Sequence, residues 1–149
     1  MAVLLCAACF KTFPLGKLDS EIYKKLYKAK EFIDDSYCSP IDLDQISKEA
    51  AISPFHFLRL FHRVYNKTPH KYLTEKRIDR AKQLLSKNDM SVTDICFELG
   101  FQSPGSFSTM FNKHVGYSPS EYRMISERKF YLSVNFPEKL IPGCFLIFG

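Results

Sequence analysis

An internal repeat of about fifty residues constrains the fold of this 149-residue chain more than any other feature of its sequence. When the numbering is shifted by fifty, Ser103-Pro104 falls on Ser53-Pro54. The same shift places Phe107 on Phe57, Phe111 on Phe61, Lys113 on Arg63, Ser118-Pro119 on Thr68-Pro69, and Tyr122 on Tyr72. So many matches in one register indicate a structural unit that is used twice.

Each copy predicts a helix that begins at a Ser-Pro pair, because serine is a favoured N-cap and proline suits the first helical turn. Two phenylalanines four residues apart then share one face, which we expect to be buried. A shorter helix precedes each copy, capped by Asp42 with Gln45 and by Ser91 with Asp94, which have the spacing of capping boxes. A short helix, a tight turn and a second helix form a helix-turn-helix unit.

These signals predict an all-α fold in which two helix-turn-helix subdomains are joined by a long linker helix, with a short β segment at the termini. The chain divides into an apolar tail at 1–16, a first subdomain at 17–67 that opens with a helix over 20–36, a linker helix at 68–87, a second subdomain at 88–126, and a C-terminal tail at 127–149.

The C-terminal tail has the alternating pattern of a strand. Phe130, Leu132, Val134 and Phe136 alternate with polar or amphipathic residues, and a second apolar run follows at 144–148. The pattern predicts a hairpin, or a strand that pairs with residues 2–10 or with a second molecule. The last helix is expected to end near Ser126.

The net charge of +5 is concentrated in one stretch. From Ser53 to Lys87 there are nine Lys and Arg residues against two acids, a net +7, so the rest of the chain is close to −2. A solvated helix face would explain such a run, but here the charge coincides with the repeated helix. We therefore favour an anionic, itself periodic partner, and double-stranded DNA is the natural candidate.

The composition argues against several other classes of protein. Five scattered cysteines do not form a disulfide framework, and the pair Cys6 and Cys9 lacks a second pair at zinc spacing, so we expect neither a metal nor a cofactor. No cysteine has the basic neighbours of an activated nucleophile, so we expect no enzyme. No apolar run reaches the ~18 residues of a membrane span. The expected location is the cytoplasm.

Residues 20–126 resemble the DNA-binding domain of the AraC/XylS family of bacterial transcription regulators. The resemblance rests on the two repeat copies and on four further stretches: Thr68-Pro69 with Tyr72-Leu73, Arg77-Ile78 through Leu84-Leu85, Gly100-Phe101, and Gly116 through Arg123. It implies that each unit places one helix in a major groove, that the two grooves are adjacent, and that the protein works on promoters near RNA polymerase. A linker of about 18 residues would span ~27 Å, comparable with the ~34 Å between successive major grooves.

For the first unit, the resemblance implies base contacts from the start of the repeated helix and phosphate contacts around it. Arg59 is the main candidate, because arginine can hold guanine through two hydrogen bonds, although a phosphate contact is the alternative. Phe55 and Leu58 either touch thymine methyl groups or pack against the first helix. The expected DNA-contacting residues are Ser53, Pro54, Phe55, Leu58, Arg59, His62, Arg63, Lys67 and Lys71.

Two other residues in the basic stretch are expected to have structural roles. His56 is predicted to be partly buried, and Arg77 is predicted to form an ion pair with Asp94 or Glu98.

For the second unit, the outward positions carry short side chains, which read bases poorly. Thr109 stands where the family often has a basic or long polar residue. We therefore expect mostly phosphate contacts there, aided by the N–H groups of capped helix starts. The phosphate contacts are expected from Ser103, Ser106, Asn112 and Lys113, with His70 and Ser118 as further phosphate candidates. The other residues of this unit expected to contact DNA are Pro104, Gly105, Ser108 and Thr109.

The alternative is a protein-interaction module. In this hypothesis the helices persist, DNA binding is weak and non-specific, and the terminal strands recruit a partner or a second copy of the chain.

Overall fold

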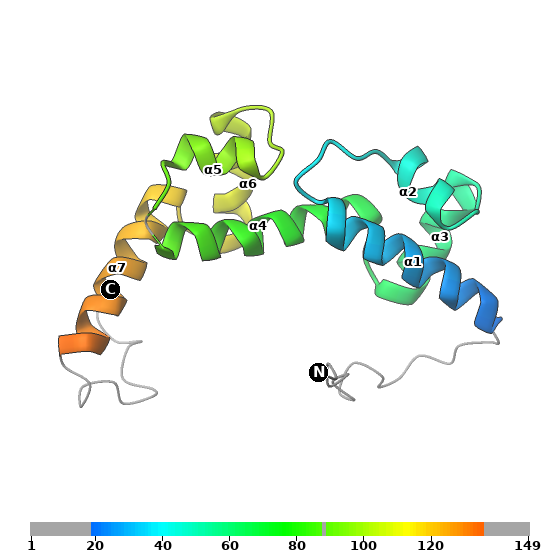
Figure 1. Ribbon diagram of the computed structural model, residues 1–149, viewed down its shortest axis with the longest axis horizontal. Helices are drawn as coiled ribbons and strands as arrows, with labels where there is room; N and C mark the ends of the chain where they lie inside the picture. The colour runs from blue at the N-terminus through cyan, green and yellow to red at the C-terminus, as the bar shows by residue number, and fades with distance from the viewer. Residues whose placement is uncertain (1–18, 88, 136–149) are drawn as a thin grey trace.

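The computed structural model describes residues 19–87 and 89–135. Within these ranges every element of regular secondary structure is a helix (Figure 1). The helices are α1 (Ser20–Ser36), α2 (Leu43–Glu49), α3 (Pro54–Tyr65), α4 (Pro69–Lys87), α5 (Val92–Glu98), α6 (Pro104–Val115) and α7 (Pro119–Asn135). The pairs α2–α3 and α5–α6 lie at opposite ends of α4 and form the two expected helix-turn-helix units. The predicted all-α fold is confirmed for the described residues.

Two helices, α2 and α7, begin with reciprocal capping bonds, and the one at α2 was predicted. Asp42 accepts from the Gln45 N–H at 2.8 Å, while the Gln45 side chain accepts from the Asp42 N–H at 2.9 Å. At the start of α7, Glu121 accepts from the Ser118 N–H at 2.7 Å and donates its own N–H to the Ser118 hydroxyl at 3.3 Å. Each box satisfies backbone donors that the helix leaves unpaired.

The other serine caps differ from expectation in detail. Ser103 caps α6 by accepting from the Ser106 N–H at 3.2 Å, but Ser53 occupies the N-cap of α3 without a side-chain capping bond. Ser91 accepts a hydrogen bond from the Asp94 N–H at 3.0 Å. The Asp94 carboxylate accepts from the Ser91 hydroxyl at 2.6 Å and not from the Ser91 backbone N–H, so this capping box is half formed.

The repeat reappears as two matched hydrophobic cores. In the first, Phe57 and Phe61 lie 5.4 Å apart between ring centroids, and in the second Phe107 and Phe111 lie 5.7 Å apart. Tyrosines at the same offset close each cluster, Tyr72 on Phe61 and Tyr122 on Phe111. All four phenylalanines are fully buried. Each therefore contributes roughly 1.5–3 kcal/mol to folding.

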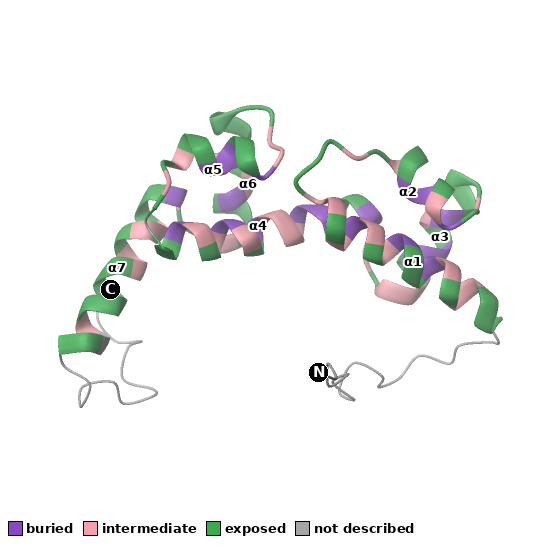
Figure 2. Cartoon of the chain, viewed as in Figure 1, coloured by how far each residue is buried: buried purple, intermediate pink, exposed green. Residues whose placement is uncertain are grey.

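Helix α4 belongs to both cores. Its residue Leu73 packs in the first core, with Leu26, Ala29, Ile33 and Ile46 from α1 and α2. Its residues Ile78, Ala81 and Leu85 pack in the second, with Ile95 and Leu99 from α5 and its C-cap. Figure 2 shows buried positions along the length of α4. One helix therefore holds both subdomains.

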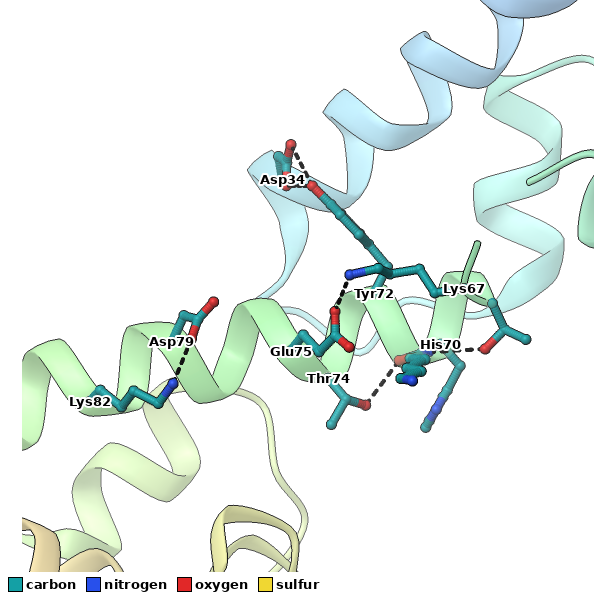
Figure 3. A network of polar contacts seen from close by, with 10 residues as sticks. Asp34, Lys67, His70, Tyr72, Thr74, Glu75, Asp79 and Lys82 are labelled. Carbon is teal, nitrogen blue, oxygen red and sulfur yellow. Dashed lines mark hydrogen bonds and ion pairs between the residues drawn. The ribbon is translucent and has the colours of Figure 1, made fainter. Parts of the chain in front are cut away.

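A polar network ties α1 to α4. The Asp34 carboxylate accepts from the Tyr72 hydroxyl at 2.8 Å and pairs with Lys30 at 2.7 Å and Lys76 at 2.8 Å; Figure 3 shows the tyrosine pointing at the acid. Burial raises the pKa of Asp34, but the hydrogen bonds from Lys30, Lys76 and Tyr72 outweigh it, so the pKa lies below its usual value. Burial and the bond to Asp34 raise the pKa of Tyr72 to about 12.

The strand predicted for the C-terminal tail is wrong where the structure describes it. Helix α7 does not end near Ser126 but continues to Asn135, so Phe130, Leu132 and Val134 are helical. A helix that is already started and packed against α4 extends at little cost, whereas a lone strand has no partner for its hydrogen bonds. The tail at 1–16, the predicted pairing with residues 2–10, and residues 136–149 lie outside the described residues.

Arg77 is structural, as expected, but its predicted partners are wrong. Its guanidinium bonds the carbonyl oxygens of Tyr37 and Ser39, at 2.7 and 2.9 Å, rather than Asp94 or Glu98. Because the loop after α1 reaches α4, two residues that are distant in the sequence supply the acceptors.

Gly100→Ala should destabilise the protein more than Gly116→Ala. Both glycines have positive φ, +72° and +84°, but a Cβ at Gly100 would lie 2.5 Å from the Cys38 carbonyl oxygen, while one at Gly116 would meet nothing within 4 Å. We expect a loss of about 1 kcal/mol at Gly116 and about 3 kcal/mol at Gly100, where overpacking is added. Urea denaturation measures both, and equal losses would contradict the close approach.

Asp34→Asn should remove stability that depends on pH. Because the pKa of Asp34 in the folded state lies below the unfolded value of about 3.9, its ionised form stabilises the fold above that pH, and the contribution is lost as the pH falls through the folded pKa. We expect a loss of about 1–2 kcal/mol at neutral pH and almost none in strong acid. Thermal or urea melts across pH measure this, with Asp35→Asn at the exposed neighbouring position as the control. A difference between wild type and Asp34→Asn that does not vary with pH would contradict the prediction.

Candidate nucleic-acid interface

Helix α3 has an apolar inner face and a basic outer face. Phe57, Leu60 and Phe61 point into the core, whereas Phe55 and Arg59 lie on the solvent side. Phe55 is 73% exposed, so its ring faces the solvent beside Arg59. Of the residues predicted to contact DNA, Ser53, Pro54, Phe55, Arg59, His62 and Arg63 are exposed, and Leu58 is half-buried.

The guanidinium of Arg59 is available for a ligand. Within residues 19–87 and 89–135 it forms no hydrogen bond or ion pair. It lines a shallow hollow together with Phe55, His56, Leu60 and Arg63. Helix α3 contains no Asp or Glu, so nothing on the helix itself neutralises this face.

His56 is exposed, which contradicts its predicted partly buried, structural place. It follows Phe55 on the first turn of α3 and lies beside Arg59 in the same hollow. Consecutive residues of a helix are 100° apart, so His56 points in a different direction from its buried neighbour Phe57.

The basic residues after α3 divide into two kinds. Lys71 and His70 are exposed at the start of α4. Lys67 is half-buried, and its ammonium pairs with Glu75 (Figure 3). A phosphate contact from Lys67 would therefore compete with an internal ion pair.

Helix α6 presents a smaller and less charged outer face. Among the predicted residues, Ser103, Pro104, Gly105, Ser106, Thr109, Asn112 and Lys113 are exposed, and Ser108 is half-buried. The Ser106 hydroxyl donates to the Ser103 carbonyl at 2.8 Å, and the two serine hydroxyls lie 3.1 Å apart. These hydroxyls already serve the helix start, so Asn112 and Lys113 are the longer polar groups on this face.

The two outer faces differ although the inner faces match. At the repeat offset of fifty, Arg59 corresponds to Thr109 and Phe55 to Gly105, while Arg63 keeps its charge as Lys113. The first face therefore combines a cation with an exposed aromatic ring, and the second offers short groups plus one lysine. This arrangement suits base reading by α3 and backbone contacts by α6.

Two further exposed residues lie on the second unit and were not predicted to contact DNA. His114 is exposed next to Lys113, and Tyr117 is 50% exposed just after α6. Tyr117 occupies the position of Lys67 at the repeat offset, so the repeat itself could have identified it.

The described residues contain neither a metal-binding cluster nor a membrane-spanning helix. No group of three or more His, Cys, Asp or Glu side chains there could hold a metal ion. None of the described helices is both long and apolar enough to cross a membrane.

Comparison with known proteins agrees with this geometry. Residues 46–125 match a family described as a helix-turn-helix domain. The chain is 32% identical over 98 residues to the melibiose operon regulatory protein of Escherichia coli strain K12, covering 66% of this chain and 32% of that protein. The chain thus spans about a third of the length of the curated relatives that it matches first.

Solved structures share the fold. An AraC-type transcriptional regulator from Chromobacterium violaceum is 29% identical with a TM-score of 0.65, covering 72% of this chain and 96% of that one. The DNA-binding domain of AdpA, crystallised in complex with a target DNA, has a TM-score of 0.60 at 23% identity, covering 80% of this chain and 99% of that one. With the family match extending over more than half of its residues, the chain belongs to the AraC/XylS family of helix-turn-helix, DNA-binding transcription regulators.

Proposed function

We propose that this protein is a sequence-specific transcription regulator that inserts α3 and α6 into adjacent major grooves of promoter DNA. The observation that carries this proposal is the exposed Arg59, which has no partner in the described part of the chain and lies on a helix without acids. The repeat supplies a second helix with the same start and the same buried face fifty residues later.

The length of α4 supports contact with two grooves by one molecule. Its 19 residues span about 28 Å at 1.5 Å per residue. That length is of the same order as the ~34 Å between successive major grooves on one face of the duplex. A single chain would therefore need no partner to span both grooves.

In this proposal the two helices have different tasks. Arg59 reads guanine, and Phe55 and Leu58 contact thymine methyl groups beside it, with Pro54 at the helix start. The phosphates are held by the flanking residues Ser53, His62, Arg63, Lys67 and Lys71 and, on the second unit, by Ser103, Ser106, Asn112 and Lys113. The other outward positions of α6 face the groove with short groups that read bases poorly: Pro104, Gly105, Ser108 and Thr109.

The solved complex of the AdpA domain with its target DNA supports DNA as the partner. The family further suggests action in the cytoplasm at promoters, close to RNA polymerase. The proposal involves no catalytic step and no cofactor.

Arg59→Ala should reduce sequence preference far more than Lys113→Ala, which should weaken binding to all sequences alike. Loss of a bidentate arginine–guanine contact removes about 1–3 kcal/mol of discrimination at one base pair. Loss of a phosphate contact reduces affinity uniformly and lowers the slope of binding against salt by about one. Selection of binding sites from random duplexes, followed by anisotropy titrations at several salt concentrations, measures both effects.

Both residues are exposed, so circular dichroism should show an unchanged fold in each variant. If the two variants lose sequence preference to the same degree, the assignment of base reading to α3 fails.

A second function, self-association, is favoured by an exposed face of α7. Met124, Tyr131 and Val134 are each 61% exposed and share one helical face with Glu127. In an antiparallel pair of identical helices, a two-fold axis that sets Met124 opposite Val134 also sets Glu127 opposite Tyr131, where its carboxylate could accept from the hydroxyl. Such a self-complementary face fits a second copy of this chain, and the contact is helical rather than the strand pairing expected from the sequence.

The double variant Tyr131→Glu, Val134→Glu should shift a concentration-dependent dimer to monomer. The new carboxylate at position 131 would face Glu127 of the second copy, a like-charge contact, and the one at position 134 would be buried against Met124. Sedimentation velocity over a range of protein concentrations measures the shift. Lys129→Gln, at another exposed position of α7, is the control. A wild-type chain that sediments as a monomer at every concentration would exclude the contact.

A further inference from the structure

The loop that follows α1 connects the two halves of the molecule. Arg77, on α4, donates from Nε to the Tyr37 carbonyl oxygen at 2.7 Å and from Nη2 to the Ser39 carbonyl oxygen at 2.9 Å. The other side of the guanidinium covers the ring of Phe101, 5.6 Å from its centroid. Arg77 therefore joins a loop of the first subdomain to the turn that precedes α6.

The backbone of the same loop also contacts the second subdomain directly. Gly100 comes so close to the Cys38 carbonyl that a Cβ on it would lie 2.5 Å from the oxygen and 3.1 Å from Nη2 of Arg77. The Tyr37 side chain packs against both hydrophobic cores. Tyr37, Cys38 and Ser39 thus each contact either the second subdomain or Arg77.

The second connection between the two halves runs through α4. Leu73 belongs to the first core and Ile78 to the second, so a short stretch of helix separates them. Within this stretch Thr74 donates its hydroxyl proton to the His70 carbonyl at 2.9 Å, a bond that tends to bend helices. A bend there would tilt α3 relative to α6 unless a second contact opposed it.

We propose that Arg77 is a positioning residue for DNA binding, which holds α3 and α6 at the orientation that lets both enter their grooves together. This inference rests on the proposed two-groove function. Two linked binding units gain affinity from each other only when their geometry allows both to engage, so a looser junction reduces binding to a paired site far more than binding to a single half-site.

The role requires arginine rather than any cation. Its planar fork can serve two carbonyl oxygens while one face lies on an aromatic ring, whereas the ammonium of lysine is a point donor without a plane. Arg77→Lys therefore keeps the charge and removes the junction. Arg80→Lys is the matched control, since Arg80 lies on the same helix and bonds the exposed Gln83 side chain at 3.0 Å.

The test uses fluorescence anisotropy to compare two duplexes that share the selected half-site of α3. One, the paired site, extends through the adjacent groove, whose phosphates α6 would contact; the other, the single half-site, ends before that groove. For Arg77→Lys and Arg77→Ala we expect affinity for the paired site to fall about tenfold, as effective concentration is lost, and affinity for the single half-site to change less than twofold. Arg80→Lys should change neither. Equal losses on both duplexes, or no loss on the paired site, would overturn the proposal.

A measurement without DNA separates failure of this inference from failure of the proposed function. Spin labels at Asp44→Cys on α2 and Thr93→Cys on α5, both exposed, report the distance between subdomains after the native cysteines are replaced. The distance distribution should broaden in Arg77→Lys and stay narrow in Arg80→Lys. If wild type does not prefer the paired site, the two-groove function fails; if the distribution is the same in Arg77→Lys and wild type, the positioning role fails. Should Arg77→Ala unfold, Arg77→Lys alone decides the question.

Discussion

The burial of one helix in two separate cores is the constraint on which this molecule depends. Helix α4 supplies Leu73 to the first core and Ile78, Ala81 and Leu85 to the second. The seven-residue helices α2 and α5 would be marginal without packing, so each core depends on its longer helices. Sharing α4 gives both cores a long helix and fixes the distance between the helices that face outward.

The matched cores and the unmatched surfaces follow from different physical demands. A buried phenylalanine pair must fill a closed space, so both copies keep Phe at the same spacing, and truncating one would leave a cavity. Exposed positions face no such demand, so Arg59 and Thr109 can differ without disturbing either core. The protein thus carries one folding unit twice and presents two different surfaces to its partner.

Local sequence signals predicted the elements where the determinants lie close together in the chain. The capping box at Asp42, the linker helix that begins at Pro69, and the inward phenylalanines all rest on interactions within a few residues. The failures occurred where a distant segment decides. The tail from Phe130 is helical because it continues α7, the helix that contacts α4, and Arg77 finds its acceptors on a loop about forty residues earlier.

The sequence by itself determined that two similar helical units exist, where their helices begin, and which residues face the core, because periodicity and caps are local properties of the chain. It also placed the positive charge on the repeated helix. Only the tertiary structure decided that the Tyr37–Ser39 loop meets Gly100 and Arg77, that His56 joins Arg59 at the surface, and that α7 extends to Asn135. These outcomes depend on which segments lie side by side, and no pattern along the chain records that.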